Sequence, residues 1–195
     1  HLLMLSLDLT LFQALNAGPE TPAMVLWLAR AASQGEAIGM LVLLAISAKR
    51  PAHSSGHTLL LGLTAVLTTW CLVRGLRMWV PFPRPAELGL GIQWAVQGHR
   101  PGFPSMHTAT AFAMAGTLFC AGQRPVAWVG LGYAALIAWS RLCLGLHFPS
   151  DVLAGALTGL GCTAIAVRFL PLQLRWLGKF SAYWFRLAPP WVRHK

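Results

Sequence analysis

Acidic side chains are the scarcest feature of this sequence. Its 195 residues include only five Asp and Glu, and charged residues of both signs make up 10% of the chain, whereas 56% are hydrophobic. A soluble domain usually carries about 25% charged residues, so the deficit argues against a soluble all-α protein. Several apolar runs are also long enough to cross a bilayer. The sequence therefore predicts an integral membrane protein.

The sequence also lacks paired cysteine motifs, and its first residues do not resemble a leader segment. The four cysteines lie in or beside apolar runs, and none belongs to a C-x-x-C pair. This placement favours small apolar residues over metal ligands or disulfides. The first residues do not combine a positive segment, an apolar core and a small-residue cleavage site, so no cleavable signal peptide is expected.

The excess of basic residues has a membrane explanation. Fifteen Lys and Arg give a net charge of +10, but no soluble basic domain with interleaved aromatic side chains is present. No nucleic-acid partner is therefore expected. Arg and Lys that flank apolar runs are what the positive-inside rule and contact with anionic lipids produce.

The sequence predicts one membrane domain, residues 1–195, that forms an all-α bundle of five to six transmembrane helices. Residues 1–20 predict an N-terminal interfacial helix. Polar residues around Gly35 interrupt the next segment, which is either one kinked helix or a short helix followed by a span. Further spans are expected at residues 58–76, 105–121, 126–143 and 151–169, and a basic, aromatic, interfacial tail at residues 171–195.

The basic residues also predict an orientation. Residues 49–57, the turn at Arg124 and the tail carry more basic residues than the opposite face does. The positive-inside rule places them, with the C-terminus, in the cytoplasm. The other ends of the spans then face the exterior.

Three polar clusters lie at those external ends. Their positions are residues 77–85, residues 103–107 and residues 140–151. Each lies beside the end of an expected span on the same face, so a packed bundle would bring them into one pocket. Polar groups are costly near lipid, so this grouping predicts a functional site.

The clusters contain groups that suit a phosphate. Arg77, Arg84 and Arg141 supply planar, permanently charged donors that pair with phosphate oxygens. Ser105 can cap the helix that follows it, where free N–H groups favour an anion. Ser150 is expected to cap the span that begins at Asp151.

Two histidines and a carboxylate add acid–base chemistry. Asp151 lies four residues after His147, and a carboxylate that accepts a bond from imidazole Nδ1–H fixes the tautomer of the ring. His147 would then present Nε2 as a nucleophile, and His107 would protonate the leaving oxygen. No metal ion or other cofactor is expected, since the arginines would repel a cation.

The clusters resemble the three-part signature of the type 2 phosphatidic acid phosphatase (PAP2) superfamily. The matching parts are Arg77-x6-Arg84-Pro85, then Pro104-Ser105-x-His107, then Ser140-Arg141-x5-His147-x3-Asp151. The resemblance implies a helical-bundle phosphatase that works without a metal ion through a phosphohistidine. It implies His147 as the nucleophile, Asp151 as its orienting group and His107 as the general acid. Phosphate binding is implied for the residues Arg77, Arg84, Arg141, Pro104, Ser105 and Met106.

Two positions depart from the family pattern. Arg77 stands where the family usually has lysine, and Met106 stands where it usually has glycine. Arg and Lys differ in geometry, so Arg74 is a possible substitute for Arg77. Met106 is expected to contact the lipid chain or to pack. The roles of Glu36, His99 and Arg100 are left open; the last two could contact a second phosphate.

The length and the opening residues 11–16 are similar to bacterial undecaprenyl pyrophosphate phosphatases of this superfamily. That resemblance implies hydrolysis of undecaprenyl pyrophosphate at the external face of the bacterial inner membrane. Phosphatidylglycerophosphate, phosphatidic acid, diacylglycerol pyrophosphate, lipid A phosphates and lipid phosphotransfer remain alternatives. A non-catalytic lipid-binding or transport protein is a second class. Membrane lipids are the expected partners, and no obligatory protein partner is expected.

Overall fold

The computed structural model describes residues 2–48, 55–96, 98 and 100–187, and this part of the chain is helical without strands. The all-α prediction is therefore confirmed. The elements are α1 (Leu2–Leu15), α2 (Ala23–Gln34), α3 (Glu36–Ala48), α4 (Ser55–Trp79), the short 3-10 helix η1 (Pro85–Leu88), α5 (Met106–Cys120), α6 (Arg124–Cys143) and α7 (Pro149–Leu187).

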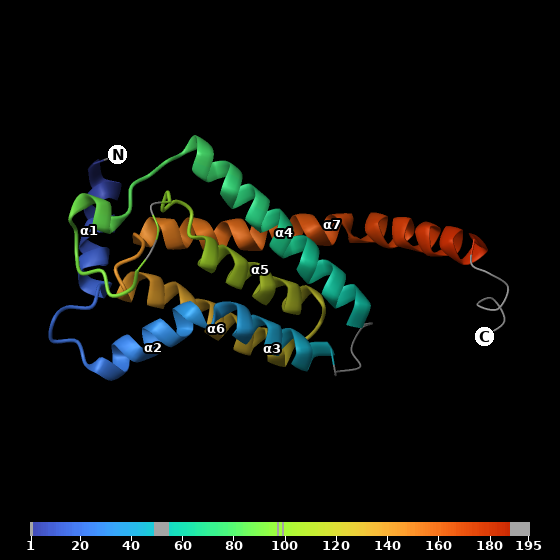
Figure 1. The fold of residues 1–195 in the computed structure, drawn as a ribbon, viewed down its shortest axis with the longest axis horizontal. Helices are drawn as coiled ribbons and strands as arrows, with labels where there is room; N and C mark the ends of the chain where they lie inside the picture. Colours follow the sequence, from blue (N-terminus) through green and yellow to red (C-terminus); the bar gives the residue numbers. More distant parts are fainter. Residues whose placement is uncertain (1, 49–54, 97, 99, 188–195) are drawn as a thin grey trace.

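Helix α5 forms the centre of the bundle (Figure 1), where α4, α6 and α7 pack against it and α3 touches it. Its sequence suits that position because small residues let neighbouring backbones approach closely. Four alanines of α5 have no exposed surface: Ala109, Ala111, Ala113 and Ala115. With 15 residues, α5 is about 22 Å long, shorter than the roughly 30 Å hydrocarbon core of a bilayer.

Two glycines of α7 allow it to lie directly on α5. A Cβ on Gly155 would come within 2.6 Å of the Ser105 carbonyl oxygen, and one on Gly159 would lie 2.9 Å from the Ala113 nitrogen. Thr163 of α7 also donates a hydrogen bond to the Ala113 carbonyl oxygen, at 2.9 Å. Gly155 and Gly159, spaced as G-x-x-x-G, thus lie where α7 comes closest to α5.

Three helices are long and apolar enough to cross a membrane: Gly56–Trp79, Arg124–Cys143 and Pro149–Leu177. Helices α2 and α3, which meet at a bend of 65°, could together add a fourth. The expected break near Gly35 is present, but the expected number of five to six spans is not confirmed. The difference arises because α5, α2 and α3 are each too short to qualify alone.

Helix α7 is longer than the sequence predicted. The expected span ended near Phe169, whereas the helix continues through Pro171 to Leu187, a length of 39 residues or about 58 Å. Figure 1 shows it extending well beyond the other helices at the end opposite the loops around α1. The predicted loop 49–57 falls largely outside the described residues, and α4 already begins at Ser55.

Candidate active site

The described residues of the three polar clusters meet at one end of the bundle, where α4 and α6 end and α5 and α7 begin. The backbone N–H of Ser105 donates to the carbonyl oxygen of Asp151 at 2.9 Å, which joins the second cluster to the third. Arg84 reaches the backbone of Leu146 from the first cluster at 3.0 Å. The convergence that the sequence predicted is therefore present in the fold.

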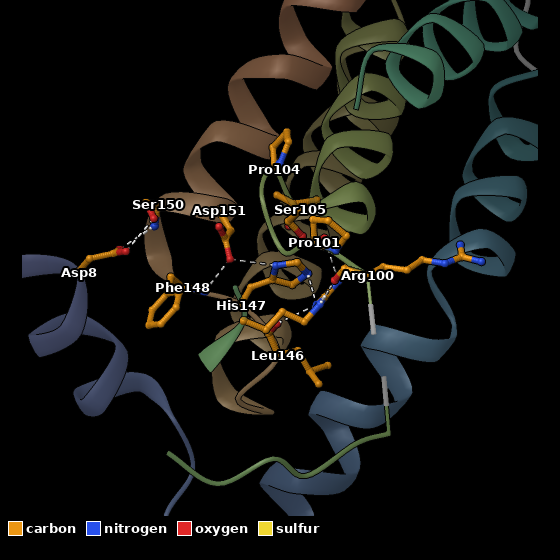
Figure 2. A network of polar contacts seen from close by, with 12 residues as sticks. Asp8, Arg100, Pro101, Pro104, Ser105, Leu146, His147, Phe148, Ser150 and Asp151 are labelled. Atoms are coloured by element: carbon orange, nitrogen blue, oxygen red, sulfur yellow. Dashed lines mark hydrogen bonds and ion pairs between the residues drawn. The ribbon is translucent and has the colours of Figure 1, made fainter. Parts of the chain in front are cut away.

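His147 and Asp151 form the centre of this site. The imidazole Nδ1 lies 3.1 Å from Asp151 Oδ2, which also accepts a 3.0 Å hydrogen bond from the Phe148 N–H. Figure 2 shows the ring of His147 directed at this carboxylate. A carboxylate on Nδ1 fixes the tautomer in which Nε2 carries the free electron pair. The ring is fully buried, with 0% of its surface exposed.

The position of His147 depends on a turn made by Gly145. This glycine has φ +70, a left-handed conformation that residues with a Cβ rarely adopt. The turn separates the end of α6 from the start of α7, so that Arg141 and His147 belong to different elements yet share one site. A Cβ at this position would also lie 3.0 Å from the Asn16 side-chain nitrogen.

Arg84 covers the other side of the imidazole. Its Nη1 lies 3.3 Å from His147 Nε2, and its Nε donates to the Arg100 carbonyl oxygen at 2.7 Å. Glu87 of η1 accepts a 3.1 Å hydrogen bond from the Arg84 backbone N–H. The guanidinium is thus buried and fixed by main-chain oxygens beside the free nitrogen of the ring.

The electrostatics keep His147 neutral. Burial lowers the pKa of His147 well below its ordinary value, and the positive charges of Arg141, Arg84 and Arg77 act in the same direction. Burial also lowers the pKa of Arg84, which the carboxylates of Asp151 and Glu87 oppose. A neutral imidazole with an available electron pair can attack a phosphorus atom.

Arg77 and the second cluster lie together beside this pair. Arg77 donates from Nη2 and Nε to the Pro104 carbonyl oxygen, at 2.8 and 3.2 Å. Ser105 is fully buried and precedes α5, but its side chain makes no capping bond. Its hydroxyl instead accepts a 3.1 Å hydrogen bond from Thr108. Ser105 therefore occupies the expected N-cap position without the side-chain hydrogen bond of a cap, and the partly exposed Met106 is the first residue of the helix.

His107 and Arg141 are contacted by the bent pair α2–α3. Arg141 donates from Nη1 to the hydroxyl of Ser33 on α2. His107 Nε2 lies 3.8 Å from Oε2 of Glu36, the first residue of α3. Sequence reasoning noted Glu36 without a role and did not include Ser33. The sequence signal that could have identified Glu36 and Ser33 is that both are polar residues within an apolar segment.

Helix α1 supports the start of α7. Asp8 accepts hydrogen bonds from the Ser150 N–H, at 2.8 Å, and from its hydroxyl, at 2.7 Å (Figure 2). Ser150 was expected to cap α7, but the helix already begins at Pro149 and Asp8 supplies the acceptor. The rings of Phe12 and Phe148 also pack with centroids 5.4 Å apart. Sequence reasoning missed Asp8 as part of the site.

Three other basic residues were possible phosphate ligands: Arg74, His99 and Arg100. The guanidinium of Arg74 is 5.2 Å from the centroid of the Trp70 ring, whereas Arg77 contacts the second cluster. Arg100 is exposed and its side chain extends away from His147 (Figure 2), while its carbonyl oxygen accepts from Arg84. His99 lies outside the described residues.

Two further features bear on where the chemistry could take place. Within the described ranges no group of three or more His, Cys, Asp and Glu is arranged to hold a metal ion. A groove of about 500 Å³ between α4 and α7 is lined by Leu60, Thr64, Phe169 and Gln173, among others. It contains none of the cluster residues, so the candidate site is assigned from the polar contacts and not from this groove.

The sequence can be compared with known proteins. The family model described as PAP2 superfamily matches residues 58–175. The Escherichia coli (strain K12) protein named putative undecaprenyl-diphosphatase YbjG is 27% identical over 192 residues, which cover 94% of this chain and 92% of that protein. A lipid A 4'-phosphatase of Bacteroides thetaiotaomicron is 38% identical over 72 residues, covering 34% of this chain and 31% of that protein.

Two crystal structures have similar folds. LpxE of Aquifex aeolicus superimposes with a TM-score of 0.69 at 29% identity and covers 83% of this chain and 95% of its own. A PAP2-type phosphatidylglycerolphosphate phosphatase from Bacillus subtilis gives a TM-score of 0.62 at 21% identity, with 85% of each chain covered. The second likeness supports the fold alone.

Proposed function

The chain belongs to the PAP2 superfamily of membrane phosphatases, and from this premise we propose that it hydrolyses undecaprenyl pyrophosphate to undecaprenyl phosphate through a phosphohistidine. One observation carries the proposal. His147 has Nδ1 on a carboxylate and Nε2 beside a buried guanidinium, at 3.1 and 3.3 Å. This arrangement suits a nucleophile whose target carries negative charge.

In the first step Nε2 of His147 attacks the terminal phosphorus. The N–P bond forms, the bond from phosphorus to the bridging oxygen breaks, and His107 gives a proton to that oxygen. Asp151 stabilises the positive charge that develops on the ring. Because the free imidazole is fully buried, the phosphate has to displace Arg84 or the surrounding loop before it reaches Nε2.

In the second step a water molecule attacks the phosphohistidine. The water loses a proton to His107, the N–P bond breaks, and inorganic phosphate leaves. Arg77, Arg84 and Arg141 offer charge that stabilises the equatorial oxygens of the transferring group, and Ser105 and the backbone of Pro104 and Met106 border the same space. These residues require neither a metal ion nor another cofactor for the two steps.

The extent of the resemblance supports the choice of substrate. The similarity to YbjG runs over 94% of this chain and 92% of that protein. We assign the site to the external face of a bacterial inner membrane, with the C-terminus in the cytoplasm. Lipid phosphates and membrane lipids are the proposed partners.

A lipid A phosphate is the second candidate substrate. One finding favours it: the local identity of 38% over 72 residues to a lipid A 4'-phosphatase. The chemistry at His147 would be the same, so the two candidates differ only in what the lipid-facing side of the site accepts.

A substrate panel tests the proposal. Phosphate release from undecaprenyl pyrophosphate, lipid A, phosphatidic acid and phosphatidylglycerophosphate is measured in detergent with EDTA present, and kcat/KM is compared. We expect the highest value for undecaprenyl pyrophosphate, and none for His147→Ala. A higher value for lipid A would select the second candidate. Loss of activity with EDTA would contradict the metal-free mechanism. A lipid-binding protein would release no phosphate and would bind lipid equally after His147→Ala.

A further inference from the structure

Four of the five acidic residues contact elements of the candidate site. Asp151 accepts from His147, Glu87 accepts from the Arg84 backbone, and Asp8 accepts from Ser150. Glu36 is the fourth and lies beside His107. The fifth, Glu20, is exposed in the turn before α2. Acidic side chains are costly in a membrane protein, so their grouping around the candidate site indicates that they have a function there.

Glu36 is brought to His107 by the break between α2 and α3. The two helices bend by 65° around Gly35, and a Cβ at Gly35 would lie 2.7 Å from the Ala31 carbonyl oxygen. Glu36 therefore opens α3 with its side chain toward α5, and Oε2 lies 3.8 Å from His107 Nε2. The Glu36 side chain is largely covered, with 15% of its surface exposed. The His107 side chain has 38% of its surface exposed.

Thr110 makes this environment suitable for either protonation state of Glu36. The Thr110 hydroxyl contacts Glu36 Oε1, the Met106 carbonyl oxygen at 2.9 Å and the His107 carbonyl oxygen at 3.1 Å. A hydroxyl has one proton to donate. It can donate to an ionised Glu36, or accept from a protonated Glu36 while donating to a carbonyl oxygen. The site therefore tolerates a proton on the carboxyl group or its absence.

The charges around His107 explain why such a partner is needed. The positively charged groups with an electrostatic influence on its imidazole are Arg141, Arg77 and Arg84. These come from α6, α4 and the loop before η1. Positive neighbours disfavour a protonated imidazole, whereas a general acid must carry a proton. Glu36, from α3, is the carboxylate that lies 3.8 Å from the His107 imidazole.

We propose that Glu36 is a positioning residue that shares one proton with His107 and keeps the general acid charged. This inference rests on the proposed function, because His107 acts as the acid there. The carboxylate holds the imidazole toward the leaving group and stabilises its cationic form. Ser33, three residues earlier on α2, holds Arg141, so the bent pair supports two residues of the site.

The proton balance closes over one turnover. His107 gives its proton to the bridging oxygen as the N–P bond forms and the P–O bond breaks. It regains a proton from the water that attacks the phosphohistidine. Glu36 is neither consumed nor transferred, and the pair ends with the one proton that it held at the start.

The pH dependence of kcat/KM tests this role through Glu36→Gln, which keeps the size of the side chain and removes its charge. An opposite charge typically shifts a neighbouring group by about one to three pH units. We expect the alkaline limb of the pH profile of kcat/KM to move to a lower pH by about one pH unit. As a result, kcat/KM at pH 8 should fall about tenfold. Glu36→Asp should restore part of the loss. Glu20→Gln, a glutamate in the exposed turn, is the matched control and should match the wild type.

A second measurement separates this inference from the proposed function. The His107 imidazole is titrated by NMR in the full chain in detergent micelles, with ¹⁵N-histidine labelling and assignment by His107→Asn. Its midpoint should fall by about one unit in Glu36→Gln, whether or not any tested lipid is hydrolysed. An unchanged midpoint, or a uniform loss of kcat/KM without movement of the alkaline limb, would overturn the proposal. An inactive wild type with a shifted midpoint would refute the proposed function alone.

Discussion

His147 lies between a carboxylate on one ring nitrogen and a guanidinium on the other. The two contacts have different effects: Asp151 fixes the tautomer, and Arg84 stands where an anionic group would come to rest. The same ring is buried among positive charges that favour its neutral form. At this scale the proposed reactivity of His147 depends on neighbours that lie far apart in the sequence, since 63 positions separate Arg84 from His147.

The buried imidazole predicts how stability depends on pH. The pKa of His147 is lowered in the folded protein, while in the unfolded chain it is about 6.5. As the pH falls through 6.5, the unfolded state binds a proton that the folded state does not, so stability decreases. Between pH 7.5 and 5.5, the Tm of the wild type in detergent should fall about 3 °C more than that of His147→Asn. Equal decreases would contradict a neutral, buried His147.

At the scale of elements, α1 fixes the loops that carry the site. Asn16, near its end, donates to the carbonyl oxygens of Ile92 and Cys143, and it accepts from the Ile92 N–H. Asp8 binds the first turn of α7, next to Asp151. This explains why a helix outside the three motifs belongs to the catalytic unit.

Removing the Asp8 carboxylate should loosen the start of α7. Asp8→Ala loses both hydrogen bonds to Ser150, at a cost of about 1 to 2 kcal/mol for a helix-terminal acceptor. We expect a lower Tm and a kcat reduced by several-fold, because Asp151 follows directly. Thr10→Val is the control on the same helix, since Thr10 is exposed and bonds only within α1, to Ser6. If both variants behave alike, the support assigned to Asp8 is wrong.

Two glycines of α7 offer a matched test of helix packing. A Cβ at Gly159 would press on the backbone of α5, whereas one at Gly161 has nothing within 4 Å. Gly159→Ala should destabilise the protein by about 1 to 3 kcal/mol and reduce phosphate release, because α5 and α7 carry His107 and Asp151. Gly161→Ala should be neutral or slightly stabilising. Thermal unfolding and activity measure both variants, and equal effects would contradict the packing.

The three motifs and their meeting at one end of the bundle could be predicted from the sequence, because their spacing and the length of the apolar runs are local properties. The residues that hold the motif side chains in place could not be predicted from the sequence. Asp8, Ser33 and Glu36 act on residues that are distant in the chain, and only the fold shows those contacts. The continuation of α7 through Pro171 was also unexpected, since proline usually interrupts a helix.

At the scale of the whole molecule, charge is distributed along the bundle. Four of the five acidic side chains gather around the end of the bundle that holds the candidate site, while exposed apolar side chains such as Leu63 and Leu157 cover the helices. The basic residues expected to face the cytoplasm lie toward the other end, at Arg124 and along the later part of α7. The polar residues proposed to bind a phosphate thus lie at one end of a largely apolar bundle.

Cysteine labelling tests the proposed orientation. Gln93→Cys places a thiol in the exposed loop above the site, and Arg124→Cys places one at the exposed start of α6. Each new cysteine should be introduced into a variant whose native cysteines have been replaced, because Cys71 and Cys120 are exposed. An impermeant thiol reagent should label Gln93→Cys in cells with an intact inner membrane, and Arg124→Cys only after permeabilisation. The reverse pattern would invert the orientation.

The proposed mechanism requires His147 as the nucleophile. Rapid quenching with substrate labelled with ³²P in the terminal phosphate should trap a phosphoenzyme that is stable to alkali and labile to acid. Mass spectrometry should place the phosphoryl group on His147, and His147→Asn should show none. Phosphorylation of another residue, or an undiminished phosphoenzyme in His147→Asn, would contradict the mechanism.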